Sequence, residues 1–241
     1  MQDVEYEKMA RAEGALWYYR ALHRHVLRSL ARNVPGAARV LDAGCGTGGL
    51  LRSLLAAQPA WQGTGLDASP LACEFARQRT TAEIVQGSVE ALPFGDATFD
   101  AIASCDVLCQ VAAPERALQE FQRCLKPGGV LVLTLPAYQW MYSYHDRQVG
   151  NLRRYARREA DGQVLASGFR EPVSTYWNML PFPLAVLRRK LLPPARAGSD
   201  VADWPRPANA FFGALMALEH AWLDRGGRLP FGSSLLTVTR K

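Results

Sequence analysis

The sequence has few of the residues that build disulfide scaffolds, metal centres or membrane spans. No apolar run reaches the ~18 residues that a membrane-spanning helix needs. The first residues lack the basic start and apolar stretch of a secretory signal, so we expect a cytoplasmic protein. No C-x-x-C pair occurs, so neither a zinc site nor a disulfide framework is indicated, and we expect no metal and mostly buried, reduced thiols. The five cysteines are Cys45, Cys73, Cys105, Cys109 and Cys124.

The charge is only mildly basic. The 28 basic and 22 acidic side chains leave a formal net charge of +6, which permits attraction to anions without indicating specific nucleic-acid binding. At 241 residues, 49% of them hydrophobic, the chain can bury a sizeable core, and collagen-like or mainly disordered classes are excluded. We expect one large domain and see no internal repeat.

Short apolar runs alternate with helical stretches along most of the chain. An amphipathic helix at 14–33 ends before Pro35-Gly36, and five strand-length runs follow, at 39–42, 63–67, 83–86, 99–104 and 130–135. Helical stretches separate them at 48–57, 70–80 and 114–125. Such alternation is typical of a parallel sheet with crossover helices. With strands at 171–177 and 235–240, it predicts a doubly wound α/β fold, a seven-stranded, mostly parallel sheet with helices on both faces.

Two apolar helical stretches, at 181–192 and 207–225, precede the last predicted strand, and a Pro/Gly/Asp-rich link at 193–207 joins them. We expect a helical lid inserted before that strand. The second stretch is apolar on more than one face, so it must bury against something. Four partners for this helix remain open: the domain itself, a dimer mate, an apolar ligand and a membrane surface. The basic run Arg188-Arg189-Lys190 would suit a membrane surface. A monomer and a homodimer both fit.

The clearest motif is Val40-Leu41-Asp42-Ala43-Gly44-Cys45-Gly46-Thr47-Gly48-Gly49, a strand that runs through glycines into a helix. Glycines let the backbone approach a ligand, and the helix start offers free N–H donors. The glycines alone also fit a dinucleotide loop. Asp42 favours adenosylmethionine, because a carboxylate there attracts an amino group and repels a pyrophosphate. Asp67, about 20 residues on, suits the two hydroxyls of a ribose in either cofactor.

Five motifs, in order, resemble the class I methyltransferases that use S-adenosylmethionine, and in particular their small-molecule, type 11-like group. Besides the loop they are Gly65-Leu66-Asp67-Ala68-Ser69, Gly87-Ser88-Val89-Glu90-Ala91-Leu92-Pro93-Phe94, Phe99-Asp100-Ala101-Ile102 and Leu125-Lys126-Pro127-Gly128-Gly129. The resemblance covers about residues 39–136. It implies a Rossmann-like fold, S-adenosylmethionine as cofactor and S-adenosylhomocysteine as product.

The resemblance also assigns the cofactor contacts. Asp42 and the loop are expected to hold the methionine part, Asp67 the ribose, and Ser88 with the Val89 amide the adenine edge. Many relatives carry Asp at the position of Ser88, and a hydroxyl accepts from an exocyclic amine more weakly than a carboxylate does. The loop contacts are expected at Gly44, Cys45, Gly46 and Gly48. The remaining expected contacts are Ala68, Cys105, Tyr19 and Arg20, the last two being equally suited to bracing the N-terminal helix.

The segment 136–155 is too polar and too aromatic for simple core, and it follows the fifth strand, where the acceptor should meet the methyl group. It resembles a subgroup with His-Asp and Arg-Arg-Tyr at this place, preceded by an aromatic-Arg helix like Trp17-Tyr18-Tyr19-Arg20. The candidate catalytic residues are His145, Asp146 and Tyr155. A neutral His145 can remove a proton, or it can merely bond the loop, and Tyr155 can equally be packing.

Four residues are candidates for binding the acceptor: Asp106, Tyr142, Arg153 and Arg154. Asp106 is expected to face the cleft, or else to cap a turn. The arginines around 153–158 form either a solvated helix face or a clamp for a carboxylate or phosphate.

The whole chain is interpreted as one methyltransferase domain acting on an O, N or C nucleophile of a small, partly apolar metabolite. A nicotinamide-dependent oxidoreductase and a non-catalytic cofactor-binding module remain the alternatives. We expect a helical cap at 1–36, a cofactor-binding core at 37–136, a substrate-side segment at 137–177, the lid at 178–234 and the last strand at 235–241.

Overall fold

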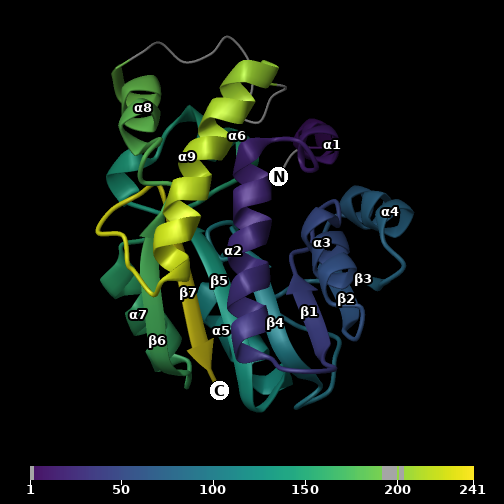
Figure 1. Cartoon of the computed structure of the whole chain (residues 1–241). Helices are drawn as coiled ribbons and strands as arrows, with labels where there is room; N and C mark the ends of the chain where they lie inside the picture. Colours follow the sequence, from purple (N-terminus) through teal and green to yellow (C-terminus); the bar gives the residue numbers. More distant parts are fainter. Residues whose placement is uncertain (1–2, 192–199, 201–203) are drawn as a thin grey trace.

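The computed structural model describes residues 3–191, 200 and 204–241, and these form an α/β fold around one seven-stranded sheet (Figure 1). The strand order is β3-β2-β1-β4-β5-β7-β6. The strands are β1 (Arg39–Ala43), β2 (Gln62–Asp67), β3 (Glu83–Gln86), β4 (Phe99–Cys105), β5 (Leu125–Pro136), β6 (Arg170–Trp177) and β7 (Ser234–Arg240). All pairings are parallel except those of β7, which is antiparallel to β5 and β6. The predicted doubly wound, mostly parallel sheet is confirmed.

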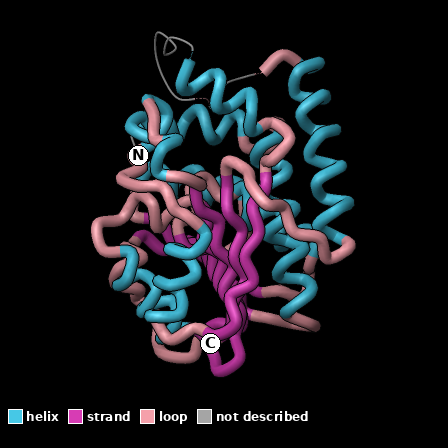
Figure 2. The backbone as a smooth tube through the Cα atoms, turned by 90° about the vertical axis from the view of Figure 1, so that its left-hand side faces the viewer, coloured by secondary structure: helices cyan, strands magenta, loops and turns pink. Residues whose placement is uncertain are grey.

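Helices cover both faces of the sheet, which Figure 2 shows from the side. Helices of the first layer include α2 (Trp17–Asn33), α3 (Gly49–Ala57) and α9 (Arg206–Asp224), and those of the opposite layer include α5 (Pro114–Cys124) and α7 (Arg157–Ala166). α4 (Pro70–Arg79) packs beside β2 and β3. The remaining helical segments are α1 (Asp3–Ala12), η1 (Gln139–Met141), α6 (Tyr144–Val149), α8 (Phe182–Val186) and the π-helical turn η2 (Leu187–Leu191).

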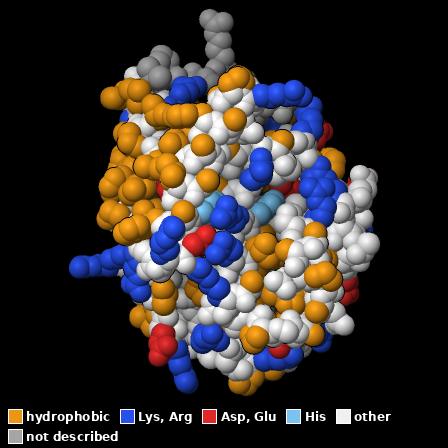
Figure 3. All heavy atoms as spheres, viewed as in Figure 1, with side chains coloured by type: hydrophobic (Ala, Val, Ile, Leu, Met, Phe, Trp, Pro, Cys, Tyr) orange, Lys and Arg blue, Asp and Glu red, His pale blue; other side chains and the backbone are white. Residues whose placement is uncertain are grey.

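α2 and α9 lie side by side on the outer surface of the first layer. Arg24, Arg28 and Arg32, one helical turn apart on α2, all place a guanidinium nitrogen within 3.7 Å of the Asp224 carboxylate at the end of α9. Figure 3 shows Lys and Arg side chains gathered on the middle of this face. The sequence repeat of arginines on this helix therefore serves to hold α9.

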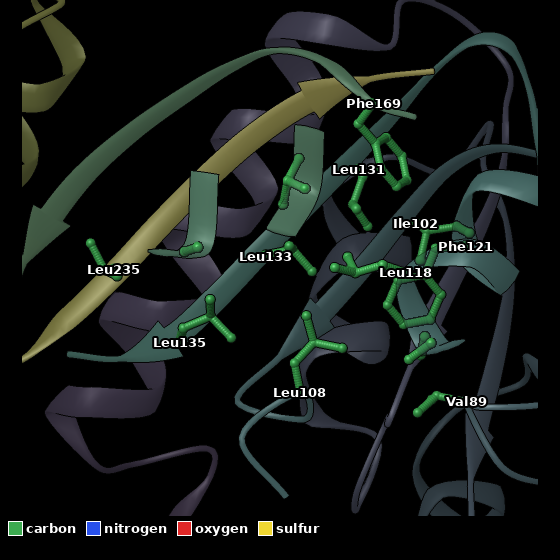
Figure 4. Close-up of a cluster of buried hydrophobic side chains, with 14 of the residues drawn as sticks. Val89, Ile102, Leu108, Leu118, Phe121, Leu131, Leu133, Leu135, Phe169 and Leu235 are labelled. Atoms are coloured by element: carbon green, nitrogen blue, oxygen red, sulfur yellow. The ribbon is translucent and has the colours of Figure 1, made fainter. Parts of the chain in front are cut away.

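The core is divided by the sheet, because successive side chains of a strand point to opposite faces. Ala101, Ala103 and Val132 pack against α2 and α3, whereas Ile102 and Leu133 pack against α5 and α7. Figure 4 shows the second of these clusters, with Ile102, Leu131, Leu133 and Leu135 beside Leu118 and Phe121 of α5. Burial on both faces explains why the strands appear in the sequence as continuous apolar runs.

The N-terminal prediction was incomplete. A helix was predicted from residue 14, but the structure has α1 first and starts α2 only at Trp17. α1 gave no apolar signal, because its buried residues are Glu5, Tyr6, Ala10 and Ala12. Its position over the ends of β1 and β2 is important for the site.

Helices α8, η2 and α9 lie between β6 and β7, as the predicted insertion requires, although the first predicted stretch is divided into α8 and η2. Most of the predicted link at 193–207 lies outside the described residues. All five cysteines are free, and four of them are buried. Within the described part of the chain, no helix has the length and apolar character needed to cross a membrane.

Candidate functional site

A cavity of about 920 Å³ lies beyond the carboxyl ends of β1, β2, β4 and β5, under α1, α2 and the inserted helices. This is where open parallel sheets bind their ligands. Its lining includes thirteen of the predicted site residues: Tyr19, Asp42, Gly44, Cys45, Gly46, Asp67, Ala68, Ser88, Val89, Cys105, Asp106, His145 and Arg154. We call its part at the ends of β1 and β2 the β1–β2 half, and the part at the ends of β4 and β5, with α6 and the inserted helices, the β4–β5 half.

Six other predicted residues do not line this cavity: Arg20, Gly48, Tyr142, Asp146, Arg153 and Tyr155. Gly48 supports the loop instead: it has φ of 82°, and a Cβ there would lie 3.0 Å from the backbone of α4. Arg20 borders a separate, smaller pocket between α2 and α3. Arg153 donates to the carbonyl of Ala112.

The glycine loop in the β1–β2 half adopts the left-handed backbone that its glycines allow. Gly44 and Gly46 have φ of 86° and 52°, and the N–H groups of Gly44 and Cys45 donate to the Leu66 carbonyl at 2.7 and 2.9 Å. Larger residues would be strained at such φ values. The loop therefore turns sharply between β1 and α3 and exposes its backbone to the cavity.

The side chain of Asp42 lines the β1–β2 half, and one oxygen of its buried carboxylate has no hydrogen-bond partner among the described residues. The residue is 1% exposed, and its Oδ2 accepts no hydrogen bond from the described residues. Burial, together with the nearby Glu13 and Asp67, raises the pKa of Asp42 to about 8. An unpaired buried carboxylate is costly. The site thus fits a ligand with a cationic amino group, which would restore the ionised form of Asp42.

Asp67 is fixed at the end of β2 by three donors. Its Oδ2 accepts from the Gly46 N–H at 2.9 Å, and its Oδ1 accepts from the Ser69 N–H at 2.9 Å and from the Tyr6 hydroxyl at 3.4 Å. A carboxylate offers about four lone-pair positions, so with three donors in place one position on Oδ2 stays open for a ligand hydroxyl. The arrangement holds Asp67 in one orientation toward the cavity.

α1 and the turn that follows it also contribute to the site, which the sequence did not predict. Tyr6, Met9 and Glu13 line the cavity. Glu13 accepts from Thr47 of the loop and lies 3.3 Å from a guanidinium nitrogen of Arg79. Burial raises the pKa of Glu13. These contacts join α1, the glycine loop and α4, and no local sequence pattern signals them.

In the β4–β5 half, Asp106 follows β4 directly in a left-handed conformation, with φ of 56°. Its Oδ2 accepts from the Tyr18 hydroxyl at 3.0 Å, and its Oδ1 from Thr134 at 3.4 Å. Burial raises the pKa of Asp106 and also that of Tyr18, which keeps the phenol a donor. Strained backbone with a perturbed carboxyl in a cleft is typical of functional sites.

His145 also lines the β4–β5 half, but its ring is engaged. The backbone N–H of Asp200 donates to Nδ1 at 3.0 Å, so the neutral ring carries its proton on Nε2. Burial and the nearby Arg189 lower the pKa of His145 to about 4. The geometry suits a hydrogen-bond donor and does not favour the predicted proton-abstracting role.

Arg154 is the cation at the wall of the same half, and it is buried. Its Nε donates to Asp146 Oδ1 at 2.8 Å, and a terminal nitrogen donates to the Ala137 carbonyl at 3.0 Å. Asp146 also accepts from Asn151 and from the Ser143 N–H. Although burial opposes it, Arg154 holds the pKa of Asp146 below its usual range. Asp146 therefore orients Arg154. Of the two arrangements considered for the arginines at 153–158, a solvated helix face does not describe Arg154, which is buried.

Tyr155 and Tyr142 lie behind this wall. Tyr155 is fully buried in the core and donates to the Leu108 carbonyl at 3.0 Å, and Tyr142 donates to the Asn151 carbonyl at 2.8 Å. The rest of the β4–β5 half is mostly apolar and aromatic. Its apolar lining residues include Leu16, Trp17, Leu22, Val107, Val111, Leu184, Leu187, Trp204 and Phe212.

Comparison with known proteins agrees with this geometry. Residues 41–133 match the sequence profile of a family described as "Methyltransferase domain". A malonyl-[acyl-carrier protein] O-methyltransferase of Enterobacter lignolyticus is 28% identical over 230 residues, which are 90% of this chain and 88% of that protein. The ubiquinone/menaquinone biosynthesis C-methyltransferase UbiE of Syntrophotalea carbinolica is 34% identical over 174 residues, covering 60% of this chain and 73% of that protein.

Solved structures share the fold. A putative methyltransferase of Haloferax volcanii, in complex with the Trm112 activator, has a TM-score of 0.64 at 24% identity, over 99% of this chain and 94% of that chain. The phosphoethanolamine N-methyltransferase 2 of Haemonchus contortus, with S-adenosyl-L-methionine bound, has a TM-score of 0.61 at 16% identity, over 90% of this chain and 52% of that chain. The chain belongs to the class I methyltransferases, and its cofactor is S-adenosylmethionine.

Proposed function

We propose that this enzyme methylates an oxygen, nitrogen or carbon atom of a small, partly apolar metabolite that carries an anionic group. The observation that carries the proposal is the position of Arg154, a guanidinium held by Asp146 at the wall of an otherwise apolar cavity half. A planar guanidinium with fixed orientation binds a carboxylate or phosphate well. The names of the relatives include O- and C-methyltransferases, so the acceptor atom stays open.

The β1–β2 half is proposed to hold the cofactor. Asp42 binds the amino group of the methionine part, Asp67 the ribose hydroxyls, and Ser88 with the Val89 amide the adenine edge. Support comes from the unpartnered Asp42 oxygen and from the glycine backbone that borders the same space. When bound, S-adenosylmethionine supplies an electrophilic methyl group, and transfer leaves S-adenosylhomocysteine.

The β4–β5 half is proposed to align the acceptor. Methyl transfer is an in-line displacement, so the protein's main task is to hold the nucleophile at about 3 to 3.5 Å from the methyl carbon. For an acceptor that must lose a proton, we propose Asp106 as the base, because burial raises its pKa and makes it a stronger base than an ordinary carboxylate. His145 is proposed to donate from Nε2 to the acceptor and so to position it.

The test is formation of S-adenosylhomocysteine with a panel of acceptors that pair an apolar body with a carboxylate, each matched to its neutral amide. We expect turnover with acids and a KM at least tenfold higher for the amides. Arg154→Lys should raise the KM of the acids and leave that of the amides unchanged. Equal turnover of acids and amides would contradict the anionic requirement. Cofactor binding without turnover of any acceptor would instead favour a binding module.

A further inference from the structure

Helix α9 buries two polar side chains beside its inward apolar residues and leaves three large apolar side chains exposed. Glu219 and His220 point inward and are 2% and 3% exposed. Phe211, Leu218 and Trp222 point outward and are 56%, 65% and 56% exposed. Because these three residues are seven and four positions apart, they form one stripe along the helix.

The inward polar residues have definite structural partners, which fixes this orientation. Glu219 accepts from the N–H groups of Asn178 and Leu180 at 2.8 and 2.7 Å, and a His220 ring nitrogen lies 3.3 Å from the Ala21 carbonyl. The helix cannot rotate its apolar stripe inward without breaking these bonds. The hydrogen bonds of Glu219 and His220 therefore keep the apolar stripe exposed in the folded protein.

Further exposed apolar side chains lie on α8, on η1 and in the loop after α9. Leu184 of α8, Trp140 and Phe231 are each between 43% and 54% exposed, and the Phe182 ring contacts both aromatic residues. Figure 3 shows hydrophobic side chains gathered along the left-hand side of this view, the side on which α8 and the loop after α9 lie. We call these residues, with Phe211, Leu218 and Trp222, the outer apolar face. Exposed large apolar side chains gathered in this way mark an interaction site.

Among the described residues of the helices that border this face, the exposed charged side chains are cationic. The exposed cations beside it are Lys190, Arg206, Arg225 and Arg228. Within the described helices α8, η2 and α9, the acids are Glu219, which is buried, and Asp224, which three arginines of α2 surround. A two-fold pairing of this face with a second copy would bring like charges together. Leu, Phe and Trp flanked by Lys and Arg are typical of surfaces that lie on anionic lipid.

We propose that the outer apolar face docks on an anionic membrane surface. Leu184 belongs both to this face and to the lining of the main cavity. A docked enzyme would thus hold the β4–β5 half of its cavity next to the lipid. Docking is measured by binding to lipid alone, so its test does not depend on the identity of the proposed acceptor.

The test is sedimentation of the full chain with vesicles of phosphatidylcholine, with and without phosphatidylglycerol. We expect binding only to the vesicles that contain phosphatidylglycerol, and weaker binding as sodium chloride is raised. L218Q/W222Q should lose at least tenfold in binding, because two apolar side chains no longer enter the lipid. R225Q/R228Q should lose about fivefold per cation.

The matched control is L165Q, which changes a leucine of α7 that is 51% exposed in the opposite layer of helices. It should bind vesicles like the parent, and every variant should keep its melting temperature and its affinity for S-adenosylhomocysteine. The proposal is overturned if the parent does not prefer phosphatidylglycerol, or if L165Q loses as much as L218Q/W222Q. It is also overturned if the parent is a dimer in solution that L218Q/W222Q converts to monomers without lipid.

Discussion

In the β1–β2 half of the cavity the backbone sets the geometry, whereas in the β4–β5 half distant side chains set it. Gly44 and Gly46 take left-handed conformations that local sequence dictates, and their neighbour Asp67 is held by adjacent N–H groups. The orientation of Arg154 depends instead on Asp146 and Ala137. The position of the proton on the His145 ring depends on Asp200. The first half is thus suited to a constant ligand, and the second can change with the acceptor while the fold stays the same.

The largest effect is expected from substitution of Asp106, in the β4–β5 half. Asp106→Asn should keep the hydrogen bond from Tyr18 but remove the base, and lower kcat by about 10² to 10⁴ for an acceptor that must lose a proton. The affinity for S-adenosylhomocysteine, measured by calorimetry, should change by less than about threefold. The control is Asp100→Asn, at the other end of β4. Parent-like turnover of Asp106→Asn would remove Asp106 from the chemistry.

The converse pattern is expected for Asp67 in the β1–β2 half. Asp67→Ala removes the acceptor of the Gly46 N–H and the proposed ribose contacts, and should weaken S-adenosylhomocysteine binding about 10- to 100-fold. Because the loss is in binding, saturating cofactor should restore most of the turnover. Asp96→Asn, a surface acid paired with Arg123, serves as control. If turnover stayed low at saturation, the division of labour between the halves would be wrong.

A smaller effect is expected from pH. Because the pKa of Asp42 is about 8 without ligand, binding of a cationic amino group must release its proton. The affinity for S-adenosylhomocysteine should therefore rise about tenfold from pH 6.5 to pH 8, and calorimetry in buffers of different ionisation enthalpy should detect the released proton. Asp42→Asn should abolish both effects. Affinity that is independent of pH in the parent would contradict the assignment.

The same pKa has a consequence for stability. Since burial raises the pKa of Asp42 above its ordinary 3.8, the protonated residue favours the folded state at low pH. That contribution falls as pH rises through about 8. The cofactor-free Asp42→Asn variant should therefore melt above the parent at pH 9 and close to it at pH 4.

The smallest effect is expected for Tyr155, which lies behind the β4–β5 half. Tyr155→Phe removes its hydrogen bond to the Leu108 carbonyl and should lower the free energy of unfolding by about 1 kcal/mol. Denaturant unfolding measures this loss, and kcat should be unchanged. A large fall in kcat with parent-like stability would restore Tyr155 to the catalytic candidates.

The same contrast explains what the sequence could predict. Alternating apolar runs predicted all seven strands, because both faces of the sheet are buried, and the glycines predicted the loop. α1 escaped prediction because its buried positions include Glu5 and form no apolar stripe. The state of His145 could not be predicted either, since its partner Asp200 lies 55 positions further along the chain.

The most direct test of the central claim is a crystal structure with S-adenosylhomocysteine bound. The account predicts the amino nitrogen at ~3 Å from Asp42, the ribose hydroxyls on Asp67, and the sulfur facing the β4–β5 half beside Asp106. A cofactor bound with its amino group away from Asp42, or with its sulfur turned from Asp106 and Arg154, would contradict it.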